Sequence, residues 1–290
     1  MKTAYIKHII SLLLFGLNGV VASFIALSSY ETVFFRTLLG SLLLVIIFFI
    51  TRKKLTFYKK KKAFAFLCGS GICMGISWMF LYEGYAQLGV SLSTLMYSCG
   101  PVIVMMLSPI VFKERFTVIK LLSFATVFAG MILVNGVVFE SGNFWGFFCG
   151  IMSAVCYSGM VIFNKKVKEI EGLENSMLQL FISFLLVAIF VVIRQGFIIK
   201  VGASSIIPLL VLGFINTGVG CYLYFSSIGK IPAQSVSILG YLELLGAIIF
   251  SFIFLHEKLV WWQYIGAVLI IAGAVVGEFF GNKMLRHKKT

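Results

Sequence analysis

Long runs of apolar residues, separated by short polar segments, follow one another along the whole chain. A helix that crosses a bilayer needs about 20 mainly apolar residues, and the sequence contains ten runs of about this length. They cover residues 6–27, 32–51, 63–86, 91–112, 117–138, 143–164, 177–199, 206–228, 234–255 and 259–280. The pattern therefore predicts an all-α integral membrane protein with ten transmembrane helices and no soluble domain.

The composition agrees with lipid as the solvent for most of the chain. Hydrophobic residues make up 60% of the 290 residues and charged residues 12%, whereas soluble domains carry about 25% charged residues. The net charge of +14 does not indicate a nucleic-acid-binding protein, because such proteins spread basic residues over a folded face. Here the basic residues lie in short segments at the ends of apolar runs, so we expect no nucleic-acid partner.

The distribution of Lys and Arg predicts the orientation in the membrane. Of the 24 basic residues, 19 fall on the side that carries both termini, three fall on the other side, and Arg36 and Lys120 fall inside predicted spans. Cytoplasmic loops are the ones enriched in Lys and Arg. We therefore expect both termini to face the cytoplasm, an even number of spans, and a multi-pass protein of the cytoplasmic membrane.

A weak internal repeat relates the two halves of the chain. An offset of 143 positions aligns residues 101–136 with residues 244–279 without a gap. Five predicted spans separate the copies, and because five is odd, the second copy should be inverted in the membrane. The sequence thus predicts two inverted five-helix repeats, residues 1–138 and residues 139–290, the second with a short basic tail. Such repeats are common in secondary transporters, which bind solute near the midplane where the repeats meet.

Several short motifs carry a resemblance to a known family. Phe112-Lys-Glu-Arg-Phe and Leu255-His-Glu-Lys-Leu end corresponding spans, Gly100-Pro101 and Tyr241-Leu-Glu-Leu lie in corresponding spans, and Phe35-Arg-Thr-Leu-Leu-Gly lies in the second span. With its ten spans and its repeat, the whole chain resembles the paired EamA repeats of the drug/metabolite transporter superfamily, although Leu244 stands where that family usually has Pro. The resemblance implies a ten-helix transporter of small metabolites, often amino acids or related compounds, and frequently outward transport.

Motifs for catalysis and for metal binding are absent from the sequence. It contains no Walker loop, no HExxH, no GxSxG and no Asp, which excludes P-type pumps and aspartate-dependent transferases. The six cysteines lie inside apolar runs without a CxxC pair, which favours packing over metal binding or disulfides. His8, His256 and His287 lie at or beyond span ends. We expect no enzyme activity, no metal and no cofactor.

Small residues and one proline predict close helix packing and a kink. Gly142, Gly146, Gly150, Ala154 and Ser158 recur every four positions, and such a stripe lets helix backbones approach closely, either as static packing or as a surface that slides during gating. Pro101 lies within the fourth span and cannot donate a backbone hydrogen bond, so we expect a kink there. The freed carbonyl needs a partner, either a neighbouring hydroxyl or water and solute.

Hydrogen-bonding and aromatic side chains fall inside several spans and suggest a common wet cavity. The candidates for solute contact are Asn18, Trp78, Tyr82, Tyr97, Tyr157, Asn216, Tyr241 and Glu243. Thr94 and Ser98 add polarity to the fourth span. The alternative is that these groups only form hydrogen bonds between helices, which contribute about 0.6 kcal/mol each on average.

Glu243 is the strongest single candidate for function. It lies near the middle of the ninth predicted span, where an ionised carboxylate costs several kcal/mol unless it faces protein or water. The repeat relates it to Gly100, beside Pro101. An acid at this place can hold a substrate ammonium group or a proton, and proton coupling is therefore a possibility; the alternative is a structural, hydrogen-bonded glutamate.

Arg36 and Glu83 are predicted to form a structural ion pair. Each lies a few residues inside the outer end of its span, and burying opposite charges together lowers the cost of each. Direct contact of this pair with solute is the alternative. Glu114 and Glu257 lie at span ends beside basic residues and are interpreted as caps or hinges.

These observations together predict a secondary transporter that moves a small organic metabolite across the cytoplasmic membrane by alternating access. The solute is expected to be an amino acid or a related compound, and export is the expected direction. The main alternative is a membrane-embedded scaffold or sensor without transport activity, and a membrane enzyme is a further one. Substrate identity, coupling ion and oligomeric state are left open by the sequence.

Overall fold

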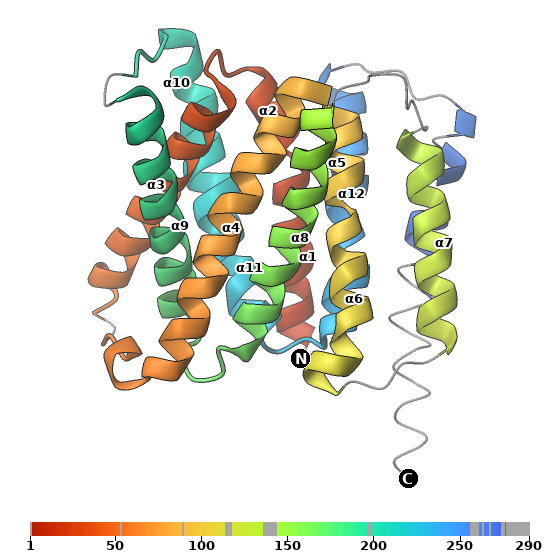
Figure 1. Ribbon diagram of the computed structural model, residues 1–290, viewed down its shortest axis with the longest axis horizontal. Helices are drawn as coiled ribbons and strands as arrows, with labels where there is room; N and C mark the ends of the chain where they lie inside the picture. Colours follow the sequence, from red (N-terminus) through yellow and green to blue (C-terminus); the bar gives the residue numbers. More distant parts are fainter. Residues whose placement is uncertain are drawn as a thin grey trace.

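The computed structural model of the chain describes residues 2–52, 54–88, 90–113, 118–135, 144–196 and 199–255, together with 261–262, 264–266, 268–273 and 276. In chain order its helices are α1 (Lys2–Gly16), α2 (Asn18–Ser23), α3 (Ser29–Ile50), η1 (Phe57–Lys59), α4 (Lys61–Leu88), α5 (Val90–Tyr97), α6 (Cys99–Phe112), α7 (Val118–Asn135), α8 (Phe144–Lys166), α9 (Gly172–Gln195), α10 (Ala203–Leu210), η2 (Val211–Val219), α11 (Gly220–Ile228) and α12 (Ala233–Leu255) (Figure 1). The predicted all-helical fold is therefore confirmed for the described residues.

Seven helical stretches among the described residues are long and apolar enough to cross a membrane, judged by length and composition. They are Lys2–Ser23, Ser29–Ile50, Lys61–Leu88, Phe144–Lys166, Gly172–Arg194, Ala203–Ile228 and Ala233–Phe254, and each overlaps one predicted span. The predicted spans at 91–112 and 117–138 contain the shorter helices α5, α6 and α7. The predicted span at 259–280 is described only in part, so the number ten remains a prediction. Glu114 and Glu257 lie outside the described residues.

Two of the predicted spans are interrupted. α5 ends at Tyr97 and α6 begins at Cys99, which places Pro101 in the first turn of α6. Proline is tolerated there because first-turn N–H groups have no acceptor within the helix, whereas deeper in a helix its ring would clash with the preceding turn. The kink predicted from Pro101 is therefore confirmed, as a break at Ser98. A similar break at Leu17 separates α1 from α2.

The segment Ala203–Ile228 has a π-helical centre that the sequence did not predict. η2 joins α10 to α11, and within it the Thr217 hydroxyl donates a hydrogen bond to the Leu212 carbonyl oxygen at 2.7 Å. π-Helical turns are rare and occur frequently at functional sites. Here the wide turn places Asn216 and Thr217 among buried residues, and both take part in contacts described below.

The core of the bundle is built from both halves of the chain. α4 packs against α8 and α9, α1 packs against α11 and α12, and α6 packs against α8 and α12. α3 packs against α9 and η2. In Figure 1, α7 lies at one edge of the bundle, and α3 and α10 lie at the other. The first and second halves therefore interleave instead of forming two separate bodies.

The outward-facing side chains are apolar. Phe49, Ile50, Ile110, Phe144 and Ile193 are 67% to 88% exposed. A soluble protein rarely exposes large contiguous apolar patches, whereas lipid is a suitable environment for them. The exposed surface thus agrees with the membrane-length helices.

Several helices of the second half begin at the positions that the weak sequence repeat assigns to helices of the first half. α3 begins at Ser29 and α9 at Gly172, while α5 begins at Val90 and α12 at Ala233. Each of these pairs is separated by the offset that aligns the two copies of the repeat. The repeat is therefore clearer in the positions at which the helices begin than in the low residue identity of the two copies.

Close backbone contacts recur at the same offset. A Cβ atom on Gly130 would lie 2.6 Å from the carbonyl oxygen of Gly266, and one on Gly273 would lie 2.8 Å from the carbonyl oxygen of Ser123. The repeat relates Gly130 to Gly273, and it also relates Ser123 to Gly266. The segment around Gly273 therefore packs on α7 by two equivalent contacts, each of which only glycine permits.

Candidate functional site

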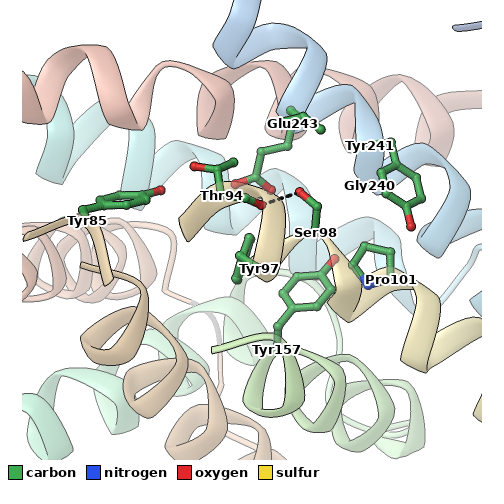
Figure 2. Close-up of a pocket in the computed structure, with 10 residues that line it drawn as sticks. Tyr85, Thr94, Tyr97, Ser98, Pro101, Tyr157, Gly240, Tyr241 and Glu243 are labelled. Atoms are coloured by element: carbon green, nitrogen blue, oxygen red, sulfur yellow. Dashed lines mark hydrogen bonds between the residues drawn. The ribbon is translucent and has the colours of Figure 1, made fainter. Parts of the chain in front are cut away.

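Two adjoining cavities lie among α1, α2, α4, α5, α6, α8, α11 and α12. The first has an empty volume of about 350 Å³ and is lined by Tyr85, Thr94, Tyr97, Ser98, Pro101, Tyr157, Gly240, Tyr241, Glu243 and Leu244 (Figure 2). The second has an empty volume of about 360 Å³ and is lined by Phe15, Asn18, Met74, Trp78, Tyr97, Tyr157, Met160, Cys221, Tyr224, Phe225 and Glu243. Three residues, Tyr97, Tyr157 and Glu243, line both cavities.

The Glu243 carboxylate has no hydrogen-bond or ion-pair partner among the described residues. Its side chain is partly exposed to the cavities, and Figure 2 shows it reaching from α12 toward Thr94 and Ser98. The hydroxyl of Ser98 is itself committed to the Thr94 carbonyl oxygen, to which it donates at 2.7 Å. A carboxylate without a protein partner inside a membrane bundle is expensive to keep, which points to a ligand or a proton as its partner.

The backbone around Glu243 is held against α1 by a glycine. A Cβ atom on Gly16 would lie 2.9 Å from the Glu243 carbonyl oxygen and 2.9 Å from the Ala247 amide nitrogen. These are backbone atoms, which cannot move aside as a flexible side chain would. Gly16 therefore fixes the distance of α1 from the part of α12 that carries the acid.

Tyrosines surround the shared part of the two cavities. The rings of Tyr97 and Tyr157 meet edge to face with their centroids 5.1 Å apart, and the hydroxyls of Tyr157 and Tyr224 lie 3.3 Å apart. Tyr241 lines the first cavity, and its hydroxyl is buried without a partner among the described residues. The structure therefore brings the predicted residues Tyr97, Tyr157 and Tyr241 together with Glu243.

Asn18 and Asn216 are joined directly to each other. The side-chain amide of Asn216 donates to the Asn18 side-chain oxygen at 3.2 Å. Asn18 also lines the second cavity, whereas Asn216 lines neither cavity. For Asn216 the sequence analysis allowed two roles, contact with solute or a hydrogen bond between helices. The structure shows the second of these.

Trp78 and Tyr82 hold the buried guanidinium of Arg36. Nη1 of Arg36 donates to the Tyr82 hydroxyl at 2.7 Å, and Nε donates to the Thr217 hydroxyl at 3.1 Å. The guanidinium carbon lies 4.1 Å from the centroid of the Trp78 ring, a cation–π contact. Nη2 is buried and has no partner among the described residues. Trp78 also lines the second cavity, whereas Tyr82 lines neither.

The predicted ion pair between Arg36 and Glu83 is not formed. Glu83 instead accepts hydrogen bonds from Ser29 at 3.2 Å, Gln87 at 3.0 Å and Trp145 at 3.3 Å. Tyr82 and Glu83 are consecutive on α4, so their side chains leave the helix about 100° apart. The face of α4 that contacts Arg36 therefore carries Tyr82 and not Glu83. The prediction compared only the depths of Arg36 and Glu83 in the membrane, and depth does not tell which face of α4 points toward Arg36.

Several lining residues carry no charge and were missed by sequence reasoning. They are Phe15, Met74, Met160, Cys221, Tyr224 and Phe225. A signal existed for two of them, because the repeat offset relates Cys221 to Trp78 and Phe225 to Tyr82. Tyr224 has no such signal, since its repeat-related residue is Leu81.

The stripe of small residues on α8 packs against α4, α5 and α6. A Cβ atom on Gly146 would lie 2.5 Å from Leu88, and one on Gly150 would lie 2.4 Å from Met96. The Ser158 hydroxyl donates to the Gly100 carbonyl oxygen at 2.9 Å. These contacts account for the stripe as close packing, and sliding during gating stays a hypothesis.

Comparison with known proteins identifies the family. The sequence model of the EamA-like transporter family matches residues 2–136 and again residues 144–277. The chain belongs to this family. The resemblance seen in the sequence is thus confirmed, and the EamA-like model matches twice along the chain.

Relatives of this EamA-like protein agree with a membrane transporter. It is 25% identical over 280 residues to "Uncharacterized transporter YxxF" of Bacillus subtilis (strain 168), which covers 94% of this chain and 88% of that protein. A solved structure described as "Crystal structure of protein" superposes with a TM-score of 0.80 at 14% identity, covering 96% of this chain and 98% of that one. At this identity the second match concerns the fold alone.

Proposed function

We propose that this EamA-like protein is a secondary transporter that moves a small organic metabolite across the cytoplasmic membrane by alternating access. The solute would be an amino acid or a related compound, and export is the proposed direction. No cofactor is required. Both termini would lie in the cytoplasm, in agreement with the distribution of basic residues.

The observation that carries this proposal is the unpartnered carboxylate of Glu243. It faces two cavities that meet at Tyr97 and Tyr157, at a place where helices of both halves come together. A protein that used Glu243 only for packing would be expected to satisfy it with a hydrogen bond. A solute cation, or a proton as the coupling ion, supplies the missing partner.

The proposed class of solute follows from the chemistry of the cavity walls. A carboxylate favours an ammonium group, the tyrosine hydroxyls offer hydrogen bonds, and Trp78, Phe15 and Phe225 offer an apolar surface. Arg36 lies near enough for its charge to act on Glu243, and its Nη2 has no partner among the residues that the structure describes. A dipolar solute with an apolar part matches both charges better than an anion does.

Two inverted repeats, residues 1–138 and 139–290, would supply the moving parts. The contacts of Gly130 and Gly273 support this proposal, because the repeat relates both the two glycines and the two backbone atoms that they approach. Arg36 and Thr217 provide a second case: the same offset relates them to Gln179 and Met74, and the Gln179 amide lies 4.0 Å from the Met74 sulfur. Pseudo-symmetric halves can exchange conformations and so open the cavity to either side in turn.

The test begins with a search for the solute. The purified protein is screened for thermal stabilisation by a panel of amino acids, amines and carboxylates, and the best ligand is then used in proteoliposome flux. We expect stabilisation by amino compounds and measurable flux. Stabilisation by carboxylates alone would contradict the proposed role of Glu243, and stabilisation without flux would favour a sensor.

Glu243→Gln provides the decisive variant. It keeps the size of the side chain and removes its charge, so we expect a melting temperature near that of the wild type and loss of most flux. Glu171→Gln is the matched control, because Glu171 is exposed and forms a surface ion pair with Lys230 at 3.9 Å. Unchanged flux in Glu243→Gln would make Glu243 a structural residue.

A further inference from the structure

His8 is a buried titratable residue with no place in the binding site described above. The sequence suggested a position at the end of a span. The structure instead places it six residues after Lys2, about 9 Å along α1, with 0% of its surface exposed. Its ring lies on that of Tyr224, with centroids 4.9 Å apart.

The hydrogen bonds around His8 determine which of its nitrogens is basic. Ser227 has a single hydroxyl proton, which it donates to the Tyr224 carbonyl oxygen at 2.8 Å. The contact of 3.3 Å between His8 Nδ1 and the Ser227 hydroxyl therefore requires Nδ1 to carry a proton and donate it. Nε2 is then the unprotonated nitrogen. It is buried and has no partner among the described residues.

Tyr224 connects this nitrogen to the cavities. Its ring contacts His8, its hydroxyl lies 3.3 Å from that of Tyr157, and its side chain lines the second cavity together with Glu243. Tyr157 lines both cavities. Groups that can exchange protons therefore lie between Glu243 and the end of the bundle where the N-terminus lies (Figure 1), and two of them, Tyr157 and Tyr224, are in direct hydroxyl contact.

We propose that His8 is the end of a proton path that runs from Glu243 through Tyr157 and Tyr224 to the membrane face carrying the N-terminus. The proton leaves the Glu243 carboxyl group, each tyrosine hydroxyl accepts one proton and releases its own, and His8 Nε2 accepts the last. Glu243 becomes a carboxylate as His8 becomes an imidazolium. Because His8 and Tyr224 are in ring contact and Nε2 is buried, a bridging water molecule or a ring rotation is required for the last step and also for exchange of the proton with the aqueous phase.

Other charged and titratable groups face both ends of the path. Lys165 on α8 faces His8, and its positive charge disfavours an imidazolium there, so His8 holds the transferred proton only transiently. On α12, which packs against α1, Gln234 and Ser235 are buried and uncharged. Six groups face Glu243, namely Arg36 on α3, Tyr82 and Tyr85 on α4, Tyr97 on α5, Tyr157 on α8 and Tyr224 on α11. Glu243 is the one carboxylic acid among these groups and His8 is the one imidazole, so they form the two ends of the path.

The proposal rests on the proposed function in taking Glu243 as the group in the cavity that binds a proton, but its test needs no transported solute. Dicyclohexylcarbodiimide modifies a carboxyl group in apolar surroundings when that group is protonated. Sealed vesicles of known orientation are treated with it while the pH is varied on the N-terminal side and held constant on the other. Mass spectrometry of the peptide containing Glu243 then reports its protonation.

In the wild type we expect labelling of Glu243 to rise as the pH on the N-terminal side falls. His8→Gln and Tyr224→Phe should each lose most of this response. Tyr224→Phe keeps the ring packing, so it remains informative if His8→Gln fails to fold. Tyr222→Phe is the matched control on the same helix, because the Tyr222 ring contacts Lys7 at 5.3 Å, and it should keep the full response.

Two outcomes would overturn the proton path. One is wild-type labelling that does not follow the pH on the N-terminal side, and the other is labelling that follows it equally well in His8→Gln and Tyr224→Phe. Absence of flux for every solute, combined with the expected labelling, would contradict the proposed transport function and leave the proton path standing. The two proposals can therefore fail separately.

Discussion

The two halves of the chain share their packing contacts but differ in their buried charges. Gly130 and Gly273 are related by the repeat and approach backbone atoms that the repeat also relates, so each half makes the same contact with the other. At the same offset, Glu243 corresponds to Gly100 and Arg36 corresponds to Gln179. Each half therefore contributes one charge that the other half replaces by a neutral residue.

This difference separates positions that are needed for helix packing from positions whose side chains face the cavities. Gly100 packs against α8, where a Cβ atom would lie 2.5 Å from the Tyr157 ring, whereas Glu243 faces the cavities. Gln179 donates to Ser70 at 2.8 Å, whereas one guanidinium nitrogen of Arg36 has no partner within the described part of the chain. The unequal residues place one buried positive charge and one carboxylate in the bundle without repeat-related counterparts.

The largest expected effect concerns the inverted orientation of the second half, because a reporter inserted between the halves should be either fully active or inactive. A reporter enzyme that is active only outside the cytoplasm is fused to each terminus and inserted between residues 138 and 139. Because five spans precede the junction, the junction reporter should be active and both terminal reporters inactive. Equal activity at the junction and at either terminus would contradict two inverted halves.

The next largest effect should distinguish the repeat-related glycines Gly16 and Gly159. Gly16→Ala places a methyl group 2.9 Å from backbone atoms of α12, while Gly159→Ala places one 3.1 Å from the Cys73 side chain. Overpacking against backbone costs about 1–3 kcal/mol, whereas a cysteine side chain can move. We expect thermal unfolding to show clear destabilisation of Gly16→Ala and little change in Gly159→Ala. Similar losses in both variants would mean that α1 and α8 tolerate the extra methyl group equally.

The sequence predicted the helices well because the bilayer imposes a length and an apolar composition on every span. It also predicted the break in the fourth span, because a proline in the interior of a long helix removes a backbone hydrogen bond and clashes with the preceding turn. The π-helix at Val211–Val219 was missed, since in a mainly apolar run there is no clear polar pattern for a wider turn to shift. Such irregular turns depend on tertiary contacts that a single sequence does not display.

The sequence predicted site residues whose burial in lipid is energetically costly. It did not predict contacts that depend on how each helix is rotated about its axis. Glu243 was predicted because an acid in the middle of a membrane span is costly and is usually retained for function. The structure places it at both cavities. The partner of Arg36 was predicted wrongly, because depth along a span does not tell which face of the neighbouring helix is presented. Tyr224 and His8 were missed because tyrosine and histidine near span ends are common as anchors.

A double-mutant cycle should show that Arg36 is coupled to Tyr82 more strongly than Gln179 is to Ser70. Arg36→Met and Tyr82→Phe remove a hydrogen bond to a charged group, for which we expect a coupling of about 1.5–3 kcal/mol. Gln179→Leu and Ser70→Ala remove a neutral hydrogen bond between membrane helices, for which about 0.6 kcal/mol is typical. Unfolding free energies of the single and double variants provide both values. Equal coupling in the two pairs would mean that the charge of Arg36 adds nothing to its contact with Tyr82.

The smallest effect is expected between Arg36 and Glu83, and it sharpens the same comparison. Glu83 accepts its hydrogen bonds from Ser29, Gln87 and Trp145, and it shares none of these partners with Arg36. Residues without shared partners have additive effects within about 0.3–0.5 kcal/mol. Glu83→Gln should therefore destabilise the protein by the same amount whether position 36 is Arg or Met, as measured by thermal unfolding in one detergent. Because Tyr82 lies next to Glu83 on α4, the Arg36–Tyr82 cycle serves as the internal positive control. A coupling energy between Arg36 and Glu83 as large as that between Arg36 and Tyr82 would mean that the ion pair forms, with the guanidinium between the two side chains. Additive effects would mean that Glu83 does not bind Arg36. One nitrogen of Arg36 would then remain available to the Glu243 carboxylate or to a solute.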